Sequence, residues 1–201
     1  MSVNNKDANY KEKLKQALNS TFKVISDNYN FDKKTDKKSN FFELDSLNTK
    51  SDFIKARAET DSSALKKKFS NDTIYKKNLP LNSSCKSLYQ IAEKIRYESL
   101  GCEMLKGIEK NLKNNYNKII SQKNKDKLKT KEDVSINEAF ELYMLKKFHN
   151  IKLNELSNKM LSFWENDFDK SINEHIKFLK DNLENQNNYS TKFCEIIEEM
   201  N

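Results

Sequence analysis

The sequence predicts an all-α protein, an irregular helical bundle of about six to seven helices with a flexible polar segment near residues 27–50. Glycine and proline are nearly absent, at two and one in 201 residues, whereas sheet-containing folds need both at their many tight turns. Hydrophobic residues make up 36% of the chain and charged residues 33%. The apolar residues nevertheless recur three and four positions apart, which is the spacing of one face of an α-helix.

The N-terminal part divides into a helix and a connector. Residues 1–26 form the first predicted helix, whose apolar face comprises Tyr10, Leu14, Ala17, Leu18, Phe22 and Ile25. Residues 27–50 follow as a flexible connector, because this polar stretch offers little surface to bury. Residues 51–201 then make up the helical bundle domain.

The first helices of the bundle have recognisable ends. One spans roughly Asp52 to Phe69. After Pro80, the run Asn82-Ser83-Ser84 supplies side-chain oxygens that cap a helix beginning near Cys85. We expect that helix to stop at Gly101, because glycine readily takes the backbone conformation of a helix C-terminus.

Four further apolar patterns complete the bundle. They cover residues 105–120, 136–148, 153–183 and 193–200, and Thr130-x-x-Asp133 is a capping signal ahead of the second of them. The third pattern predicts either one helix of about thirty residues or two halves broken near Asn166. In both versions Trp164 is the largest buried aromatic side chain.

The net charge of +7 is unevenly distributed and almost entirely due to lysine. Of 37 basic residues only Arg57 and Arg96 are arginine, although proteins that read bases or grip phosphates favour arginine. Residues 106–131 contain nine lysines against two acids, whereas residues from 163 onward contain nine acids against four lysines. Nucleic acid is therefore not the expected partner. A freestanding helical adaptor or weak polyanion binder that uses the lysine-rich loop 121–131 remains an alternative.

No catalytic or metal-binding pattern stands out. Cys85, Cys102 and Cys194 are widely spaced, and His149 and His175 lie far apart, so a zinc site is not expected. Neither glycine belongs to a phosphate-binding Gly-Lys-Ser/Thr loop. The chain contains no run of about 18 apolar residues that could span a membrane. The unpaired cysteines predict reduced thiols and a cytoplasmic location.

The two arginines are the most distinctive candidate site residues. A guanidinium makes several directed hydrogen bonds that lysine cannot reproduce. We therefore expect Arg57 and Arg96 to bridge helices inside the fold, with Glu98 or Asp61 as acceptors. A role in a partner interface is the alternative.

Both arginines lie in segments that resemble the N-terminal region of the CobT subunit of aerobic cobaltochelatase. Residues 56–65, ARAETDSSAL, resemble one family motif, and residues 88–101, LYQIAEKIRYESLG, resemble its arginine- and glutamate-containing signature ending in Leu-Gly. Residues 104–112, MLKGIEKNL, are similar to the family's Met-x-Gly-Val-x-x-Asn-Leu. Residues 161–165, LSFWE, resemble its Leu-Trp segment. The matches occur in order over about residues 10–200.

The resemblance implies a part in cobalamin biosynthesis. In that family, cobalt is inserted into hydrogenobyrinic acid a,c-diamide by a complex driven by ATP hydrolysis. The implied partners are a CobS-like AAA+ ATPase subunit and a CobN-like large subunit that holds the corrin. Cobalt and Mg-ATP would be handled by those subunits, and this chain would carry no cofactor.

We expect structural or interface roles for a set of residues, and the resemblance has limits. That set is Arg57, Asp61, Arg96, Glu98, Gly101, Gly107 and Trp164. The glycine and proline richness that the family shows around residues 35–50 is missing here, as are the histidines expected around residues 69–75. We also expect the family's C-terminal von Willebrand type domain, with its magnesium site, to be absent.

Overall fold

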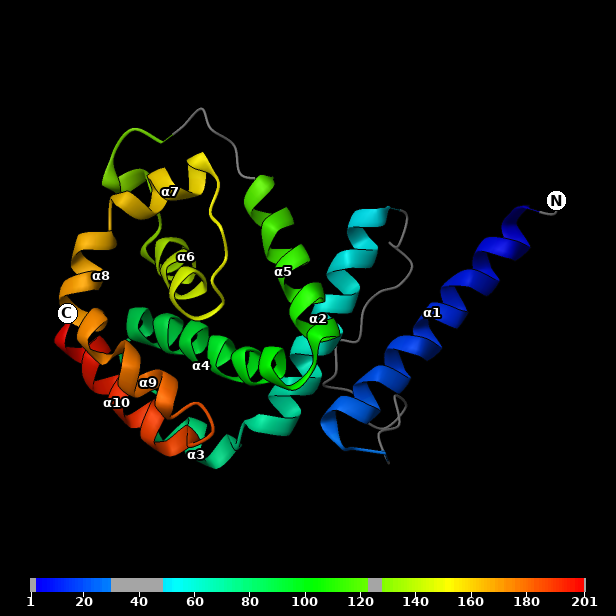
Figure 1. Ribbon diagram of the computed structural model, residues 1–201, viewed down its shortest axis with the longest axis horizontal. Coiled ribbons are helices and arrows are strands. Elements are labelled where there is room, and N and C mark those ends of the chain that lie inside the picture. Colours follow the sequence, from blue (N-terminus) through cyan, green and yellow to red (C-terminus); the bar gives the residue numbers. More distant parts are fainter. Residues whose placement is uncertain (1–2, 30–48, 123–127, 201) are drawn as a thin grey trace.

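The computed structural model describes residues 3–29, 49–122 and 128–200, and every regular element in these ranges is helical (Figure 1). The all-α prediction is therefore confirmed. The elements are α1 (Val3–Ser26), α2 (Lys50–Phe69), α3 (Asp72–Lys77), α4 (Ser83–Met104), α5 (Lys106–Ser121), the 3-10 turn η2 (Lys131–Asp133), α6 (Ile136–Phe148), α7 (Glu155–Ser162), α8 (Glu165–Ile172), the 3-10 turn η3 (Asn173–His175), α9 (Ile176–Asp181) and α10 (Gln186–Glu199).

Helix α4 is the central element of the bundle. In Figure 1 it crosses the middle of the molecule, with α6 on one side, α10 on the other, and α2 and α5 near its C-terminal end. Residues 95–101 of α4 are all buried. Because this run contains charged as well as apolar side chains, its polar groups require partners inside the protein.

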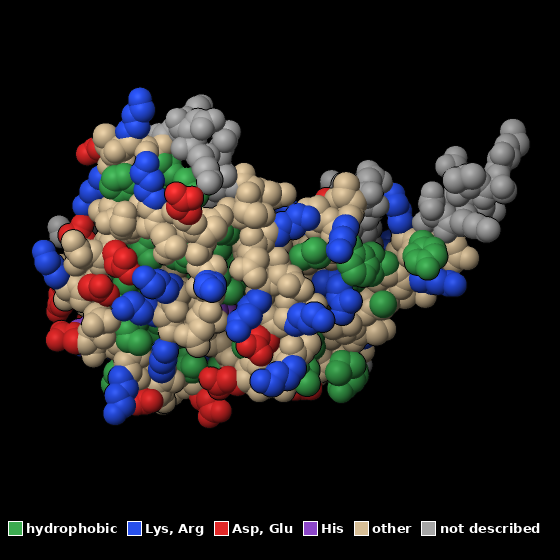
Figure 2. Space-filling view, turned by 45° about the horizontal axis from the view of Figure 1, so that its top comes forward, with side chains coloured by type: hydrophobic (Ala, Val, Ile, Leu, Met, Phe, Trp, Pro, Cys, Tyr) green, Lys and Arg blue, Asp and Glu red, His purple; other side chains and the backbone are tan. Residues whose placement is uncertain are grey.

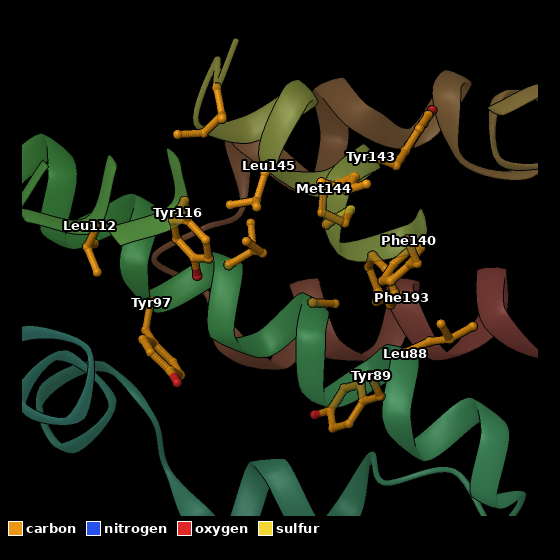
Figure 3. Close-up of a cluster of buried hydrophobic side chains, with 14 of the residues drawn as sticks. Leu88, Tyr89, Tyr97, Leu112, Tyr116, Phe140, Tyr143, Met144, Leu145 and Phe193 are labelled. Atoms are coloured by element: carbon orange, nitrogen blue, oxygen red, sulfur yellow. The ribbon is translucent and has the colours of Figure 1, made fainter. Parts of the chain in front are cut away.

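The core around α4 combines aliphatic side chains with a group of aromatic rings (Figure 3). The ring of Phe140 on α6 lies 5.9 Å from that of Phe193 on α10 and 5.5 Å from that of Phe168 on α8, both at steep angles. Edge-to-face contacts of this kind favour a defined arrangement of the rings. They fix α6, α8 and α10 relative to one another on the side of α4 remote from α2.

Helix α1 packs along α2, at the edge of the bundle (Figure 1). Phe22 and Ile25 near its C-terminal end join the main core, whereas Leu18 and Ala56 form a small separate cluster. Tyr10 is 80% exposed. The predicted apolar face of this helix is therefore buried only in its second half.

The predicted boundaries are partly confirmed. Helix α2 begins with a capping box in which Thr49 and Asp52 bond each other's backbone N–H groups. The side chain of Asn82 caps α4. The capping box of Thr130 and Asp133 begins the 3-10 turn η2, whereas α6 starts after Ser135.

Three predictions about the elements are wrong. Helix α4 continues through Gly101 to Met104, so this glycine is not a helix stop. The pattern over residues 153–183 is divided at Phe163–Trp164 and again at the 3-10 turn η3, which makes three short helices rather than one or two. Trp164 is only half-buried, because it lies at the N-cap of α8, at one of these breaks.

The predicted flexible connector, residues 27–50, lies mostly outside the described residues, which omit 30–48. Residues 123–127 of the lysine-rich loop are likewise outside them. No helix in the described ranges is long and apolar enough to cross a bilayer.

Candidate partner interface

Arg96 lies at the centre of the bundle and is completely buried. Its Nε and Nη2 atoms each donate to one carboxylate oxygen of Glu93 at 2.8 Å, a bidentate pair one turn apart on α4. Nη1 donates to the carbonyl of Leu183 at 2.7 Å, and Nη2 to the carbonyl of Phe69 at 2.6 Å. The guanidinium thus connects α4 to the C-terminal end of α2 and to the segment between α9 and α10.

Glu93 extends this network to α10. Its Oε1 atom also accepts hydrogen bonds from the hydroxyl of Ser70 at 2.7 Å and from the amide of Gln186 at 2.9 Å. The carbonyl oxygen of the Gln186 side chain accepts from the backbone N–H of Asn71 at 2.7 Å. These bonds satisfy a buried ion pair that would otherwise be costly to desolvate.

Glu98 and Asp61 form a second polar cluster and do not contact Arg96. The carboxylate of Glu98 accepts hydrogen bonds from the hydroxyls of Ser62 at 2.5 Å and Tyr116 at 2.6 Å. Asp61 accepts from the side-chain amide of Asn111 at 2.8 Å. Burial raises the pKa of both carboxyl groups. These contacts join α2 to α4 and α5.

Neither of the two expected acceptors, Glu98 and Asp61, therefore accepts a hydrogen bond from Arg96. Glu98 and Asp61 each bond residues of α2 or α5, whereas Glu93, three positions before Arg96, takes that place. The i, i+3 spacing of Glu93 and Arg96 was the signal available in the sequence. Nothing in the local sequence indicated Gln186, which lies ninety residues away and is brought in by the packing of α10.

Arg57 differs from Arg96 because its side chain is exposed on α2. The prediction that it bridges helices inside the fold is wrong. Its guanidinium carbon lies 5.7 Å from the centre of the Phe53 ring, one turn earlier on the same helix face. Water solvates the exposed guanidinium, whose positive charge also acts to lower the pKa of Asp61, one turn later on α2, against the larger effect of burial.

Arg57 and Phe53 border a groove between the first two turns of α2 and the first turns of α5. The groove encloses about 390 Å³ and is lined by Lys50, Phe53, Ile54 and Arg57 on α2 and by Gly107, Lys110, Asn111 and Asn114 on α5. We call it the α2–α5 groove. Among the residues that the structure describes, its lining contains three basic residues and no acidic one.

The two glycines have opposite surroundings. A Cβ atom at Gly101 would lie well inside contact distance of the Leu65 side chain, so this position allows α2 and α4 to cross closely. A Cβ atom at Gly107 would meet nothing within 4 Å. The absence of a side chain at Gly107 therefore leaves the groove open.

Trp164 is the N-cap residue of α8, which lies on the opposite side of the bundle from α2 (Figure 1). Its indole Nε1 donates to the carbonyl of Val134 at 3.2 Å, and the Nζ atom of Lys131 lies 4.1 Å from the ring centre. These contacts hold the turn before α6 against the start of α8. The seven sequence-predicted site residues are thus not assembled in one place.

A second hollow, of about 380 Å³, lies beside His149 at the end of α6. The imidazole is buried, with Nε2 3.3 Å from the hydroxyl of Ser99, and burial lowers the pKa of His149 to about 4. Glu109 in the lining pairs with Lys113 at 2.7 Å. The hollow therefore holds a neutral histidine and a compensated charge pair. Over the described ranges, no group of three or more potential metal ligands converges.

The α2–α5 groove is consequently the candidate site. The sequence singled out Arg57 and Gly107, but it did not indicate Lys50 or Lys110 as their neighbours. Figure 2 shows that basic side chains predominate over acidic ones on the part of the surface that carries α1, α2 and α5, with apolar patches among them.

Comparison with protein families yields one match. A family model described as "Cobalamin biosynthesis protein CobT" matches residues 8–201. The comparisons with curated proteins and with solved structures each return no match.

Proposed function

Because the chain belongs to the CobT family of cobalamin biosynthesis proteins, we propose that it is a non-catalytic assembly and coupling subunit, or the N-terminal portion of one, in an ATP-dependent cobaltochelatase. The complex inserts cobalt into hydrogenobyrinic acid a,c-diamide. The observation that carries the proposal is the extent of the family match, which spans nearly the entire chain and includes all elements from α2 to α10.

The buried polar residues support this role, because they bond other parts of the same protein. Arg96 and Glu93 pair inside the bundle, and Glu98 accepts two hydroxyl donors there. These groups hold helices together, and their partners Ser70 and Gln186 also line a hollow of about 600 Å³ between the end of α2 and the start of α10. The exposed basic and apolar residues instead lie in the α2–α5 groove, where they are available to another protein.

In this proposal the chain contacts a CobS-like AAA+ ATPase subunit and a CobN-like large subunit. Mg-ATP binds to the former, while cobalt and the corrin bind to the latter. The chain contributes helical surfaces that hold the ATPase in the orientation in which hydrolysis acts on the large subunit. It binds no cofactor of its own.

Reconstitution tests the proposal. The purified chain is combined with the ATPase and large subunits of the same chelatase, and complex formation is followed by size-exclusion chromatography with light scattering. Cobalt insertion into the corrin is measured with and without the chain. We expect a ternary complex, insertion that depends on the chain, and no ATP hydrolysis by the chain alone.

Two results would contradict the proposal. One is full cobalt insertion by the other two subunits without this chain. The other is failure of the chain to associate with either subunit while a complete CobT subunit associates under the same conditions. Tight, steeply salt-dependent binding to duplex DNA would instead favour the polyanion-binding alternative, because each neutralised phosphate adds to the salt dependence.

A further inference from the structure

The α2–α5 groove has the dimensions of a short docking site. On α2 it extends from Lys50 to Arg57 and on α5 from Gly107 to Asn114. Each side covers eight residues, and its two ends are therefore two helical turns or about 10 Å apart. A segment of about two turns from another protein would fill it lengthwise.

The floor of the groove is apolar and partly open to water. Phe53 is 39% exposed and Ile54 is half-buried. Gly107 faces them from α5 and leaves empty space where a side chain would stand. An apolar side chain that enters here would cover Phe53 and Ile54 and displace water from both, which is favourable.

The rim of the groove is positively charged. Lys50, Arg57 and Lys110 line it, and none of its lining residues in the described ranges is acidic. Asp61, whose carboxylate accepts a hydrogen bond from the lining residue Asn111, is buried. The other two lining residues on α5, Asn111 and Asn114, are neutral. The charge that a ligand encounters at the rim is therefore positive.

Building on the proposed function, we propose that the α2–α5 groove is the docking site for an acidic segment of a partner subunit. An apolar side chain of that segment enters beside Gly107, and flanking carboxylates pair with Lys50, Arg57 and Lys110. The apolar contact supplies binding free energy, whereas the charged rim selects the partner and accelerates association.

The groove suits a protein segment better than nucleic acid. A phosphate backbone would meet the three cations but would leave Phe53 and Ile54 uncovered. Proteins that bind single strands stack successive bases on several aromatic side chains, whereas the described lining of this groove contains one aromatic residue, Phe53. The apolar floor between basic residues matches an amphipathic acidic peptide.

Three variants of the full chain test the proposal. Gly107→Trp fills the groove without contacting the core. The triple variant Lys50→Glu/Arg57→Glu/Lys110→Glu reverses the charge of the rim. Its matched control, Lys152→Glu/Lys159→Glu/Lys177→Glu, makes the same change at three exposed lysines elsewhere on the surface. Thermal unfolding of each variant verifies that the fold is retained.

Binding of each variant to the purified ATPase and large subunits is measured by isothermal titration calorimetry. We expect Gly107→Trp and the rim variant each to weaken binding by roughly tenfold to a hundredfold, and the control to leave it within about threefold. Binding of the unaltered chain should also weaken as salt rises, since the rim charges are exposed.

Photo-crosslinking identifies the occupant. The photoreactive amino acid p-benzoylphenylalanine is placed at position 114, at the exposed edge of the groove where it leaves the space beside Gly107 open, and the cross-linked peptide is located by mass spectrometry in the assembled complex. We expect a partner segment with net negative charge and at least one large apolar residue. A cross-link to a second copy of this chain, to residues 30–48 of the same chain, or to a basic segment would overturn the proposal.

The outcomes separate this proposal from the proposed function. A complex that forms equally well with all variants overturns the docking site and leaves the assembly role intact. Failure of the unaltered chain to bind either subunit overturns both. Binding of a 20-base-pair DNA duplex that is lost in the rim variant but retained in Gly107→Trp would assign the rim to polyanions, and this also overturns the proposal.

Discussion

The interior around α4 and the α2–α5 groove contain the same kinds of unusual residue and use them in opposite ways. Each region has one of the two arginines and one of the two glycines. In the interior, Arg96 makes hydrogen bonds to three segments and Gly101 allows close crossing of two helices. At the groove, Arg57 is exposed and Gly107 borders empty space.

This difference shows that a rare residue type can mark a site, but that its rarity does not indicate whether the site is internal or an interface with a partner. A rare arginine is retained where a planar guanidinium is needed, but that need arises equally from buried carbonyls and from an external partner. Burial separates the two cases. Substitutions in the interior should therefore change stability, whereas substitutions at the groove should change binding and leave stability almost unaltered.

The largest expected effect is that of Arg96→Met. Removing the guanidinium leaves the Glu93 carboxylate buried without its cation, which should lower the free energy of unfolding by about 3–5 kcal/mol. Urea denaturation measures the loss. The double variant Arg96→Met/Glu93→Leu should recover part of it, because both charges are then removed. Loss of less than about 1 kcal/mol in the single variant would mean that Arg96 is not the internal link between these helices.

Arg96→Lys tests whether the fold needs the planar guanidinium of Arg96 and not only its positive charge. Lysine retains the charge but cannot make the forked bond to Glu93 and reach both carbonyls, so the melting temperature should fall. Arg57→Lys should leave it unchanged. Equal effects at the two positions would remove the distinction between interior and groove.

His149 makes the stability of the interior depend on pH. Its pKa in the folded protein is about 4, below the ordinary value of 6.5, because burial disfavours the charged imidazolium. Between pH 6.5 and 4 the imidazole binds a proton more readily in the unfolded than in the folded protein. The free energy of unfolding is therefore highest above pH 6.5 and decreases as the pH falls toward 4. The loss amounts to about 3 kcal/mol.

Comparison with His149→Gln isolates this contribution. The stability difference between the original chain and this variant should narrow by about that amount between pH 7 and pH 4, as measured by chemical denaturation at each pH. His175→Gln, at the half-buried second histidine, is the matched control. A constant difference across this range would show that the imidazole is not buried in neutral form.

Alanine substitutions at the two glycines should give a smaller difference in stability. Gly101→Ala should lower the free energy of unfolding by about 1–3 kcal/mol, because the new methyl group overlaps Leu65, which has no free space around it. Gly107→Ala should leave stability unchanged or raise it by up to about 1 kcal/mol, since alanine favours the helix and meets no atom. Thermal unfolding of both variants measures the difference. Destabilisation at position 107 would show that the groove is closed in solution.

Arg57→Ala should have the smallest effect on stability, within about 0.5 kcal/mol, since the side chain is exposed and its ring contact with Phe53 is weak. Urea denaturation measures this limit. The same variant should weaken binding to the chelatase subunits if the groove is the docking site. A clear loss of stability without a change in binding would place Arg57 with the interior residues.

Much of the fold could be predicted from local sequence signals. Apolar spacing located α2, α4, α5 and α6, and the side chain of Asn82 caps α4 as its position indicated. The break at Phe163–Trp164 lies close to the alternative break near Asn166, whereas the one at Asn173–His175 was not predicted, because no glycine or proline marks it. They arise where short helices turn to follow the curved surface of the core.

The candidate site was predicted less completely. Arg57 and Gly107 attracted attention by their rarity and by the family resemblance. Lys50 and Lys110 are two among 35 lysines, and their position beside Arg57 depends on the packing of α5 against α2.

By itself, the sequence determined the helical class, most of the helix positions and the family, because these depend on spacing and composition that a linear chain already displays. Only the tertiary structure decided which arginine is buried, which carboxylate it binds and which glycine leaves a groove. Those outcomes depend on burial and on contacts between residues as far apart as Glu93 and Gln186. Such contacts form only when the helices pack, and packing in turn sets the cost of leaving any polar group without a partner.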